Sequence, residues 1–395
     1  MSVPEHNSSN PQPPDVSLCL QTSPHARAKR KIATLMEDIK ILKQDKTTKN
    51  RKTTYYVSQG RAIRRMVILY TPIEDLIAEN DRRCEERDSS STTEEDCLQR
   101  GYIELAKVLP WLHETLAKLD HEEIEDMLRK LKRGADSAHG NNTGTLKDLM
   151  ASWVNVEYRP TPLIRTDDKY HRGFVSDVCG KLLCPVEWCW DDPLVRAGIR
   201  DRTIAFIVSE NLWLSFMYEN YEADAKSLER GLMKLKLLVM GFKAIFTSPS
   251  SANEVDREGD STDILENNQR PGRRSDQAKV KTCVASIIGM RKVTPRAIAY
   301  TACQIRFALS CITSWRTVDG DFDYQLFWNN IVDFFEDAPG PAAQVRLNGL
   351  LEWWTRKVFG RNHWQDLTPD VISKMSVNVL TSQRQQMEDT VFDSD

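Results

Sequence analysis

The stretch from Thr294 to Trp315 constrains the fold of this chain more than any other. Thr294 and Pro295 predict a helix start, because threonine is a good N-cap and proline suits the first helical position. Nearly every residue of TPRAIAYTACQIRFALSCI is apolar or small. A helix that is apolar on all sides is buried on all sides. The rest of the chain therefore has to surround this helix, and we expect a large domain.

Helix signals recur along most of the remaining sequence. Residues 71–74 (TPIE) combine an N-cap, a proline and the glutamate of a capping box, and residues 120–123 (DHEE) repeat the box. Gly134 suits a left-handed stop for the second of these helices. A last long helix is expected from Pro341 to Phe359, before another glycine.

Two more helices are expected to begin at Ser209 and Ser227, where aromatic and aliphatic residues recur at helical spacing. Strand signals are weak by comparison. Residues 203–208 (TIAFIV) and 153–158 are the best candidates, and neither alternates cleanly between turns. We therefore predict a mainly α fold, a single large multi-helix domain.

Composition divides the chain into four predicted parts. They are a disordered tail rich in Ser, Asn and Pro (1–24), a basic arm with a short amphipathic helix (25–54), the helical domain (55–364) and a polar C-terminal tail (365–395). Within the helical domain, residues 88–96 read as an acidic linker. Residues 248–278 contain almost nothing large and apolar, so we expect a disordered insertion there.

The basic arm holds the strongest local charge. From Arg27 to Arg65, thirteen Lys or Arg stand against three acids. Such a surface can neutralise phosphates or serve as a nuclear-import signal. The residues expected to make nucleic-acid or import-receptor contacts are Arg27, Lys29, Arg30, Lys31, Lys49, Arg51 and Lys52. The positive surface is expected to continue through Arg61, Arg64 and Arg65.

Apolar residues at positions 32, 35, 39 and 42 of the arm follow a heptad-like spacing. This spacing fits a short coiled coil or a docking helix, and a packed amphipathic helix explains it equally well.

The whole-chain composition limits the cellular setting. The formal net charge is −3, which excludes a uniformly cationic nucleic-acid coat. No apolar run approaches the 18 to 20 residues or so that span a bilayer, and the polar N-terminus does not resemble a signal peptide. An odd number of cysteines, nine, fits a reducing compartment. We expect an intracellular protein of the nucleus or cytoplasm, without membrane contact.

Familiar catalytic motifs are absent from the sequence. It contains no GxSxG, GxxxxGK[ST], HExxH or protein-kinase motif set, and no GxGxxG after a strand. A Cys–His or Ser–His pair assembled from distant residues stays open, because such sites form in space and not along the chain. We expect a non-enzyme without a cofactor.

Two clusters of residues contain possible metal ligands, and we interpret neither as a metal site. In the set His171, Cys179, Cys184 and Cys189, the gap of seven residues from His171 to Cys179 is longer than the x2 to x4 spacing of zinc knuckles. Cys184 lies in an apolar context (LLCPVEW), which favours a buried thiol. Residues 319–330 begin like a calcium loop, but lack the required glycine and the final glutamate. Asp192 before Pro193 is interpreted as a helix N-cap and not as part of a catalytic pair.

The buried helix after Pro295 offers one further candidate. Arg296, Tyr300 and Gln304 recur every four residues and could line an anion or phosphate pocket. The favoured alternative is an internal network of salt bridges, because unpaired buried charges are costly.

Several phrases resemble a known family. They are GKLLCP with WDDPLVRAGIRD (180–201), LLVMGFKAIFTSPSSA (237–252), VTPRAIAYTACQIRFALS (293–310) and LLEWWTRKVFG (350–360). The family comes from mushroom-forming fungi and is a domain of unknown function, and the resemblance covers residues 56 to 360. It implies a fungal origin and a helical domain, and it supplies no activity, cofactor or site residue.

Three functions follow as hypotheses. The first is a non-enzymatic binding or scaffold protein with a protein partner. The second is a nucleic-acid-binding protein that uses residues 27–65. The third is an enzyme of unrecognised type that uses the region around Arg296.

Overall fold

The computed structural model describes Met36 and residues 51–85, 91–253, 283–360 and 368–392. The chain divides into two units, residues 1–54 and 55–395. In the first unit, Met36 and residues 51–54 are helical. All packing reported below belongs to the second unit.

The described part of the second unit is mainly α, as predicted. The α-helices are α2 (Ile63–Met66), α3 (Ile73–Glu85), α4 (Thr93–Val108), α5 (Leu112–Leu116), α6 (His121–Tyr158), α7 (Asp177–Leu183), α8 (Pro193–Arg200), α9 (Lys236–Phe246), α10 (Pro249–Ala252), α12 (Val284–Ile287), α13 (Pro295–Leu309), α14 (Tyr324–Glu336), α15 (Pro341–Phe359), α16 (Pro369–Ser373) and α17 (Ser376–Phe392). Short 3-10 turns are η1 (Gly173–Val175), η2 (Ile204–Phe206), η3 (Ser215–Met217) and η4 (Glu219–Tyr221).

The two strands described are β1 (Val318–Asp319) and β2 (Phe322–Asp323), which pair in an antiparallel hairpin. Val318 lies opposite Asp323, and Gly320 turns the chain with a φ of 65°. The two stretches proposed as strand candidates are not strands: residues 153–158 belong to α6, and residues 204–206 form η2.

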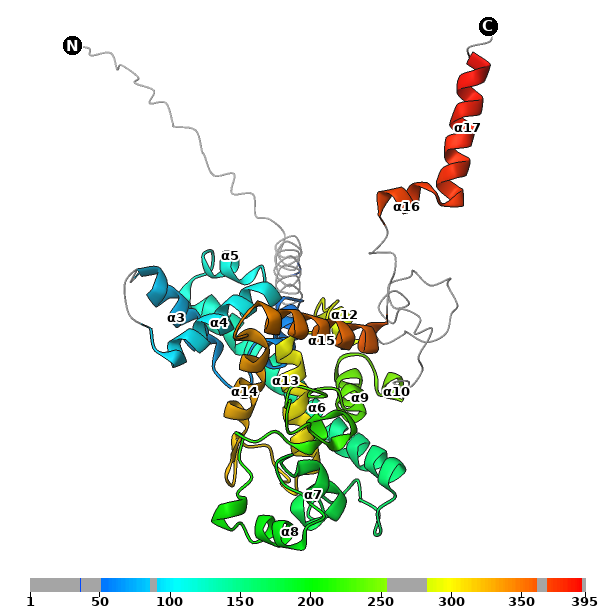
Figure 1. The fold of residues 1–395 in the computed structure, drawn as a ribbon. Helices are drawn as coiled ribbons and strands as arrows, with labels where there is room; N and C mark the ends of the chain where they lie inside the picture. Colours follow the sequence, from blue (N-terminus) through cyan, green and yellow to red (C-terminus); the bar gives the residue numbers. More distant parts are fainter. Residues whose placement is uncertain (1–35, 37–50, 86–90, 254–282, 361–367, 393–395) are drawn as a thin grey trace, which may run out of the picture. The chain divides into compact units, whose positions relative to one another are not determined.

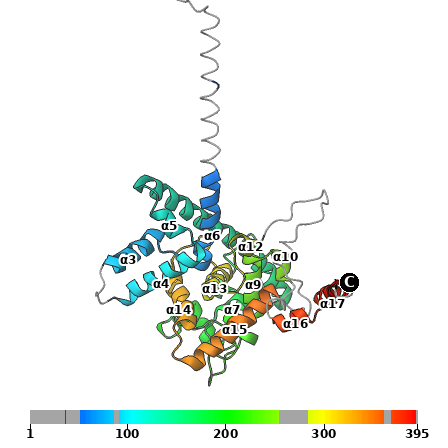
Figure 2. The same ribbon diagram turned by 90° about the horizontal axis from the view of Figure 1, so that it is seen from above.

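Helix α13 is the centre of the fold. It lies among α6, α9 and α14 in both views (Figures 1 and 2). Every residue from Arg296 to Leu309 is buried, which confirms the prediction of a helix surrounded by the rest of the chain. The Thr294 hydroxyl caps its first turn by accepting a hydrogen bond from the Ala297 N–H.

The end of α13 differs from the prediction, because the helix stops at Leu309 and does not run on towards Trp315. Two cationic side chains take its last carbonyls. Lys169 Nζ donates to the Phe307 oxygen at 2.6 Å, and an Arg172 guanidinium nitrogen donates to the Ala308 oxygen at 2.8 Å. Cations at a helix C-terminus satisfy its unpaired carbonyls and its dipole.

Helix α6 is longer than predicted, because it continues through Gly134 to Tyr158. The glycine is needed for close packing and not for a stop. A Cβ atom at Gly134 would lie 2.1 Å from the Val57 carbonyl oxygen, and one at Gly60 would lie 2.0 Å from the Leu131 carbonyl oxygen. The helical residues 55–60 therefore cross α6 with their backbones in contact.

Apolar residues along α6 enter two clusters. Met127, Leu128, Leu131 and Ala135 pack in one cluster with residues of α2 to α5, and Leu146 to Val154 pack in the larger cluster around α13. The segment between these two sets of residues is polar. Helix α6 thus joins both cores.

The helix predicted from Ser209 does not form, and the one predicted from Ser227 forms only in its second half. Residues 209–235 contain only the short turns η3 and η4, and backbone at positive φ occurs at Asn220, Gly231 and Met233. A helix cannot pass through such residues, because its φ is near −63°. The expected helix is shorter and starts at Lys236.

Other segment boundaries also differ from the prediction. Within the predicted linker 88–96, Thr92 caps α4 through a complete capping box with Glu95. Within the predicted insertion 248–278, Ser248 caps α10. The predicted C-terminal tail contains α16 and α17. Residues 254–278, the tail 1–24 and the heptad-like segment 32–42, apart from Met36, lie outside the described residues.

Candidate functional site

Arg296 is engaged in an internal ion pair. Its guanidinium donates two hydrogen bonds to the Glu336 carboxylate, at 2.8 and 2.9 Å, and a third to the Val67 carbonyl oxygen at 2.6 Å. The partner is 40 residues away in the sequence, on α14. This is the kind of contact that the alternative interpretation, an internal salt-bridge network, describes.

Tyr300 and Gln304 lie in a buried polar network between α13 and α6. Arg65 donates to Asn142 at 2.9 Å, and Asn142 donates to the Tyr300 hydroxyl at 2.9 Å. Gln304 is within 3.2 Å of the His139 ring nitrogen Nδ1. Burial raises the pKa of Tyr300 to about 12 and lowers the pKa of His139 to about 4, so both groups are neutral at pH 7.

The three aspartates of the apparent calcium loop are separately engaged. Asp319 pairs with buried Arg306 at 3.0 Å, and Asp321 pairs with Arg202 at 2.6 Å. The Asp323 carboxylate caps α14 by accepting two backbone N–H bonds. Their oxygens are used to hold the hairpin and the helix that follows it.

The histidine and cysteines considered for zinc are in different surroundings. Cys179 and Cys184 are buried, and Cys189 and His171 are exposed. Burial raises the pKa of the Cys179 thiol, and it raises that of Cys184 to about 12, which disfavours the thiolate that zinc binds. Among the described residues, no group of three or more His, Cys, Asp or Glu is placed to hold a metal ion.

The prediction that the basic surface continues to Arg65 is wrong for its last two residues. Arg64 and Arg65 are buried, where Arg64 pairs with Asp136 at 3.3 Å and Arg65 bonds Asn142. Arg51 and Lys52 are exposed. The predicted contact residues that lie outside the described part are Arg27, Lys29, Arg30, Lys31 and Lys49.

A small pocket lies where α3 and α4 meet α13 and α14, and we call it the α3–α14 pocket. Its volume is about 260 Å³. One side is formed by Ile68, Thr71, Asp75, Glu94, Cys97, Leu98 and Arg100. The other side is formed by Arg296 of α13 and by Gln325, Trp328, Asn329, Val332 and Asp333 of α14. Of the three residues proposed for a polar pocket, Arg296 lines this one.

Both arginines of the pocket already have carboxylate partners. Arg100 pairs with Asp333 across the pocket at 3.0 Å, and Arg296 pairs with Glu336. The carboxylates of Asp75 and Glu94 are exposed and have no ion-pair partner within the described residues. The unpaired charges of the lining are therefore negative.

Two further polar groups of the lining have no hydrogen-bond partner in the described part of the chain. They are the Gln325 side-chain oxygen, Oε1, and the Trp328 indole nitrogen, Nε1, both buried. The Gln325 amide nitrogen donates to Asn329 Oδ1 at 2.9 Å, which orients its oxygen away from that bond. Buried polar groups are almost always bonded, so each such exception calls for an explanation.

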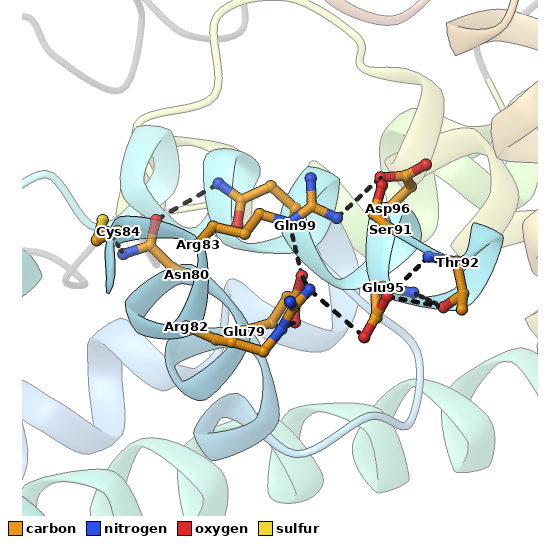
Figure 3. Close-up of polar contacts among 10 residues, drawn as sticks. All are labelled: Glu79, Asn80, Arg82, Arg83, Cys84, Ser91, Thr92, Glu95, Asp96 and Gln99. Atoms are coloured by element: carbon orange, nitrogen blue, oxygen red, sulfur yellow. Dashed lines mark hydrogen bonds and ion pairs between the residues drawn. The ribbon is translucent and has the colours of Figure 1, made fainter. Parts of the chain in front are cut away.

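A charged network fixes α3 against α4, and so fixes one side of the pocket (Figure 3). The Glu79 carboxylate accepts from Arg82 at 2.8 Å and from Arg83 at 2.6 Å. Arg83 reaches Asp96 at 2.8 Å, and Arg82 lies 3.4 Å from Glu95. Hydrogen bonds from both arginines lower the pKa of Glu79 to about 2.

This network was not predicted from the sequence, although part of its signal is local. Arg82 and Arg83 follow Glu79 at the three- and four-residue spacings that bring side chains together on a helix. The reach to Asp96 crosses from α3 to α4, and no spacing rule predicts that contact.

The fold and pocket define a class: an α-helical protein with a fully buried central helix and a small, acidic pocket beside it. The chain belongs to a family of unknown function, DUF6698, whose model matches residues 133–359. No curated protein and no solved structure matches the chain. In the described ranges, no helix is both long and apolar enough to cross a membrane.

The matched range is shorter than the 56 to 360 expected from the resemblance, because it begins inside α6. Helices α13 and α14 lie within it. Helices α3 and α4, which carry Asp75 and Glu94, precede it.

Proposed function

We propose that this protein is a non-enzymatic intracellular binding protein that takes a protein partner at the α3–α14 pocket. The observation that carries the proposal is the pocket itself, a concave surface of about 260 Å³ that exposes the unpaired carboxylates of Asp75 and Glu94 beside apolar side chains such as Leu98. A concave site with a few convergent polar groups is the usual form of a binding site.

Binding fits the lining better than catalysis does. General acid–base and nucleophilic catalysis need a base within hydrogen-bond reach of the reacting group. Of the nucleophilic side chains in the lining, Thr71 and Cys97, the Cys97 thiol has the Arg100 guanidinium at 3.2 Å as a polar neighbour, and no histidine lines the pocket. The Arg296 guanidinium, central to the enzyme hypothesis, is bonded to Glu336 and Val67.

Photo-crosslinking from inside the pocket tests the proposal. A diazirine analogue of leucine at Leu98, which lines the pocket, is expected to form a covalent adduct with a partner in extract of the native cells. The matched control places the same analogue at Leu326, which is 47% exposed on α14 and is not part of the lining.

A pocket-filling substitution makes the test specific. Asn329→Trp is expected to abolish the Leu98 adduct, because Asn329 lines the pocket. Asn348→Trp, on exposed α15 surface, is expected to leave the adduct intact. An adduct that survives Asn329→Trp, or that forms equally from Leu326, would contradict binding at this pocket, provided that circular dichroism shows both variants folded.

We also propose nucleic-acid binding as a second function, with the protein in the nucleus. The supporting observation is that Arg51 and Lys52, the described residues of the predicted contact set, are exposed. Full-length protein is expected to bind DNA or RNA with an affinity that falls steeply with salt, by about 0.9 in the log–log slope for each phosphate neutralised. Substituting Arg51 and Lys52 with glutamine should reduce that slope, and an unchanged slope would count against the role of these two residues.

We further propose that residues 32–42 form a short coiled coil and that the protein comes from a mushroom-forming fungus. If this coiled coil joins two chains, the average molar mass of the protein rises with its concentration, and analytical ultracentrifugation measures that mass.

A further inference from the structure

We infer that the ring of Tyr55, held in place by Tyr56 and Trp111, stacks on a base of single-stranded RNA. The inference rests on the second proposed function, nucleic-acid binding through residues 27–65, which include Tyr55. It names the form of nucleic acid that is bound and adds a contact to a base, whereas basic side chains contact phosphates.

Three aromatic rings meet where residues 55–60 pass the start of α5. The Trp111 ring centroid lies 5.5 Å from that of Tyr55 and 5.7 Å from that of Tyr56, and the Tyr56 and Trp111 planes differ by 30°. Tyr56 and Trp111 also pack against the apolar cluster of α2 to α5. The Trp111 indole donates to Gln59 Oε1 at 3.5 Å. Contacts from two segments of the chain therefore hold the rings in a fixed arrangement.

Tyr55 is the most exposed ring of the three. It is 46% exposed, whereas Tyr56 and Trp111 are half-buried. An exposed residue of this kind is common when it stands alone. Tyr55 differs because its ring pairs with both Tyr56 and Trp111. Those contacts restrict its rotamers, so a ligand that stacks on its open side causes little further loss of side-chain entropy.

The charge of the preceding sequence indicates what occupies this surface. Residues 25–54 directly precede Tyr55 and contain ten Lys or Arg against three acids. Proteins that bind single strands combine positive charge for the phosphates with aromatic rings for the bases. An apolar partner would cover Tyr55 and gain nothing from this charge. A single strand of nucleic acid uses both features.

The nearest acidic residue along α5 is neutralised. Glu114 is the acid closest in sequence to Trp111, and a free carboxylate there would repel phosphates. Its carboxylate lies 3.6 Å from the Lys118 ammonium, and both side chains are exposed. The pair has no net charge, so Glu114 does not oppose the binding of RNA.

Stacking on a tyrosine requires a base with an uncovered face, which selects single strands. Inside a duplex, the neighbouring base pairs cover both faces of each base. Single-stranded loops and ends are the parts of RNA whose bases stack on aromatic side chains. Cellular DNA is mainly duplex, so RNA is the main source of uncovered bases.

Fluorescence anisotropy with the full-length protein tests the inference. The labelled probes are oligouridine, the same strand paired with oligoadenosine, and oligodeoxyuridine of the same length. Oligouridine stacks very little on itself, so its bases are open. We expect it to bind tighter than the duplex, although the duplex has the denser phosphate charge. We also expect it to bind at least as tightly as the DNA strand.

Variants of Tyr55 separate stacking from charge. Tyr55→Ala should weaken oligouridine binding about tenfold, a typical effect of removing a ring that stacks on one base. It should leave the log–log salt slope unchanged, because no phosphate contact is lost. Tyr55→Phe keeps the ring and should bind like the wild type. The matched control is Tyr170→Ala, because Tyr170 is 72% exposed between α6 and α7, and it should also bind like the wild type. Thermal melts check that the variants are folded.

A photochemical crosslink locates the contact. When 5-iodouridine is placed in the strand, irradiation joins its base to an aromatic ring stacked on it, with loss of hydrogen iodide. Mass spectrometry of the digested protein should find this adduct on Tyr55. An adduct found only on other residues would contradict the inference.

Four further results would overturn it. Duplex binding as tight as that of oligouridine would show that open bases are not recognised. Wild-type affinity of Tyr55→Ala, or an equal loss in Tyr170→Ala, would remove the stacking contact. Weak binding by Tyr55→Phe would assign the contact to the hydroxyl group and not to the ring. Tighter binding of the DNA strand would overturn the assignment to RNA.

The salt dependence separates this inference from the proposed function. Binding that falls steeply with salt but is indifferent to Tyr55→Ala would overturn stacking and leave nucleic-acid binding in place. Absence of binding to all three probes at low salt would overturn both.

Discussion

Several buried polar side chains in this protein have partners that lie far away in the sequence. Arg296 is bonded to Glu336, and Asn142 joins Arg65 to Tyr300. Removing one member of such a pair leaves the other buried without a partner, which costs more free energy than the bond itself contributes. At the scale of residues, stability therefore depends on pairs.

The burial of His139 makes the free energy of unfolding depend on pH. Burial lowers its pKa from 6.5 to about 4, so between these values the unfolded chain binds more protons than the folded one. Its contribution makes the free energy of unfolding fall as the pH drops from 6.5 to 4, by at most about 3 kcal/mol. His139→Gln should flatten this part of the profile, measured by urea unfolding at several pH values.

The matched control for that measurement is His121→Gln, because His121 is exposed at the start of α6. If His121→Gln flattened the profile as much as His139→Gln, the effect would not come from the buried ring.

At the scale of elements, contacts between helices decide what single residues do. Gly134 and Gly140 are both glycines inside α6. Gly134 lies against the Val57 backbone, and no heavy atom lies within 4 Å of a Cβ built at Gly140. The same residue type therefore has a packing role at one position and none at the other.

Opposite signs are expected when these glycines become alanine. Gly134→Ala forces its Cβ against the Val57 carbonyl and should destabilise the protein by about 1 to 3 kcal/mol. Gly140→Ala should stabilise it by about 0.5 to 1 kcal/mol, because alanine is the better helix former. Chemical denaturation measures both. Equal effects of the two substitutions would contradict the close crossing of residues 55–60 over α6.

The α3–α4 network predicts a coupling between stability and pocket shape. Glu79 has a pKa lowered to about 2, so its contribution to stability is complete above pH 4.5 and is lost as the pH falls towards 2. Glu79→Gln should lower the melting temperature at pH 7, with a difference from wild type that shrinks at pH 2 to 3.

The same variant should weaken ligand binding at the α3–α14 pocket, because α3 and α4 form one of its sides. Glu74→Gln, on the same helix, should change neither property. A pH-independent difference in melting temperature for Glu79→Gln would contradict the role of its charge.

At the scale of the molecule, α6 joins two apolar clusters through a polar segment. The network of Arg65, Asn142 and Tyr300 lies at that junction. One continuous helix contributes to both clusters. We therefore expect the described residues between 55 and 360 to unfold as one cooperative unit.

Asn142→Ala tests this cooperativity. It leaves Arg65 and Tyr300 without their shared partner, and should lower the free energy of unfolding by about 3 kcal/mol. Hydrogen exchange should speed up equally in both halves of α6. Asn141→Ala, on the exposed face, should do neither. Loss of protection in residues 121–135 alone would show two separate units.

Local signals in the sequence predicted several helix starts correctly, although not those at Ser209 and Ser227. The side chains of Thr294, Asp120 and Asp192 cap their helices as expected, and α15 runs from Pro341 to Phe359. Helix ends and irregular segments were predicted poorly. Gly134 carries the signal of a stop and has the role of a close contact, and the positive φ of Tyr221 and Met233 has no local signal, because such residue types rarely adopt it.

The candidate site shows the same division. Arg296 was predicted as a polar residue on a buried helix, and it lines the α3–α14 pocket. Asp75 and Glu94 were not singled out, because exposed acids near helix starts are common in any sequence. Their significance comes from the position of α3 and α4 beside α14.

The sequence by itself determined that this protein is mainly α and that one helix, Pro295 to Leu309, is buried on every side. Both properties follow from composition and spacing within a few turns of chain. Tertiary structure alone decided which of the described charges are neutralised and which stay unpaired. Arg296 meets Glu336, and Arg100 meets Asp333, only after helices far apart in the sequence pack together.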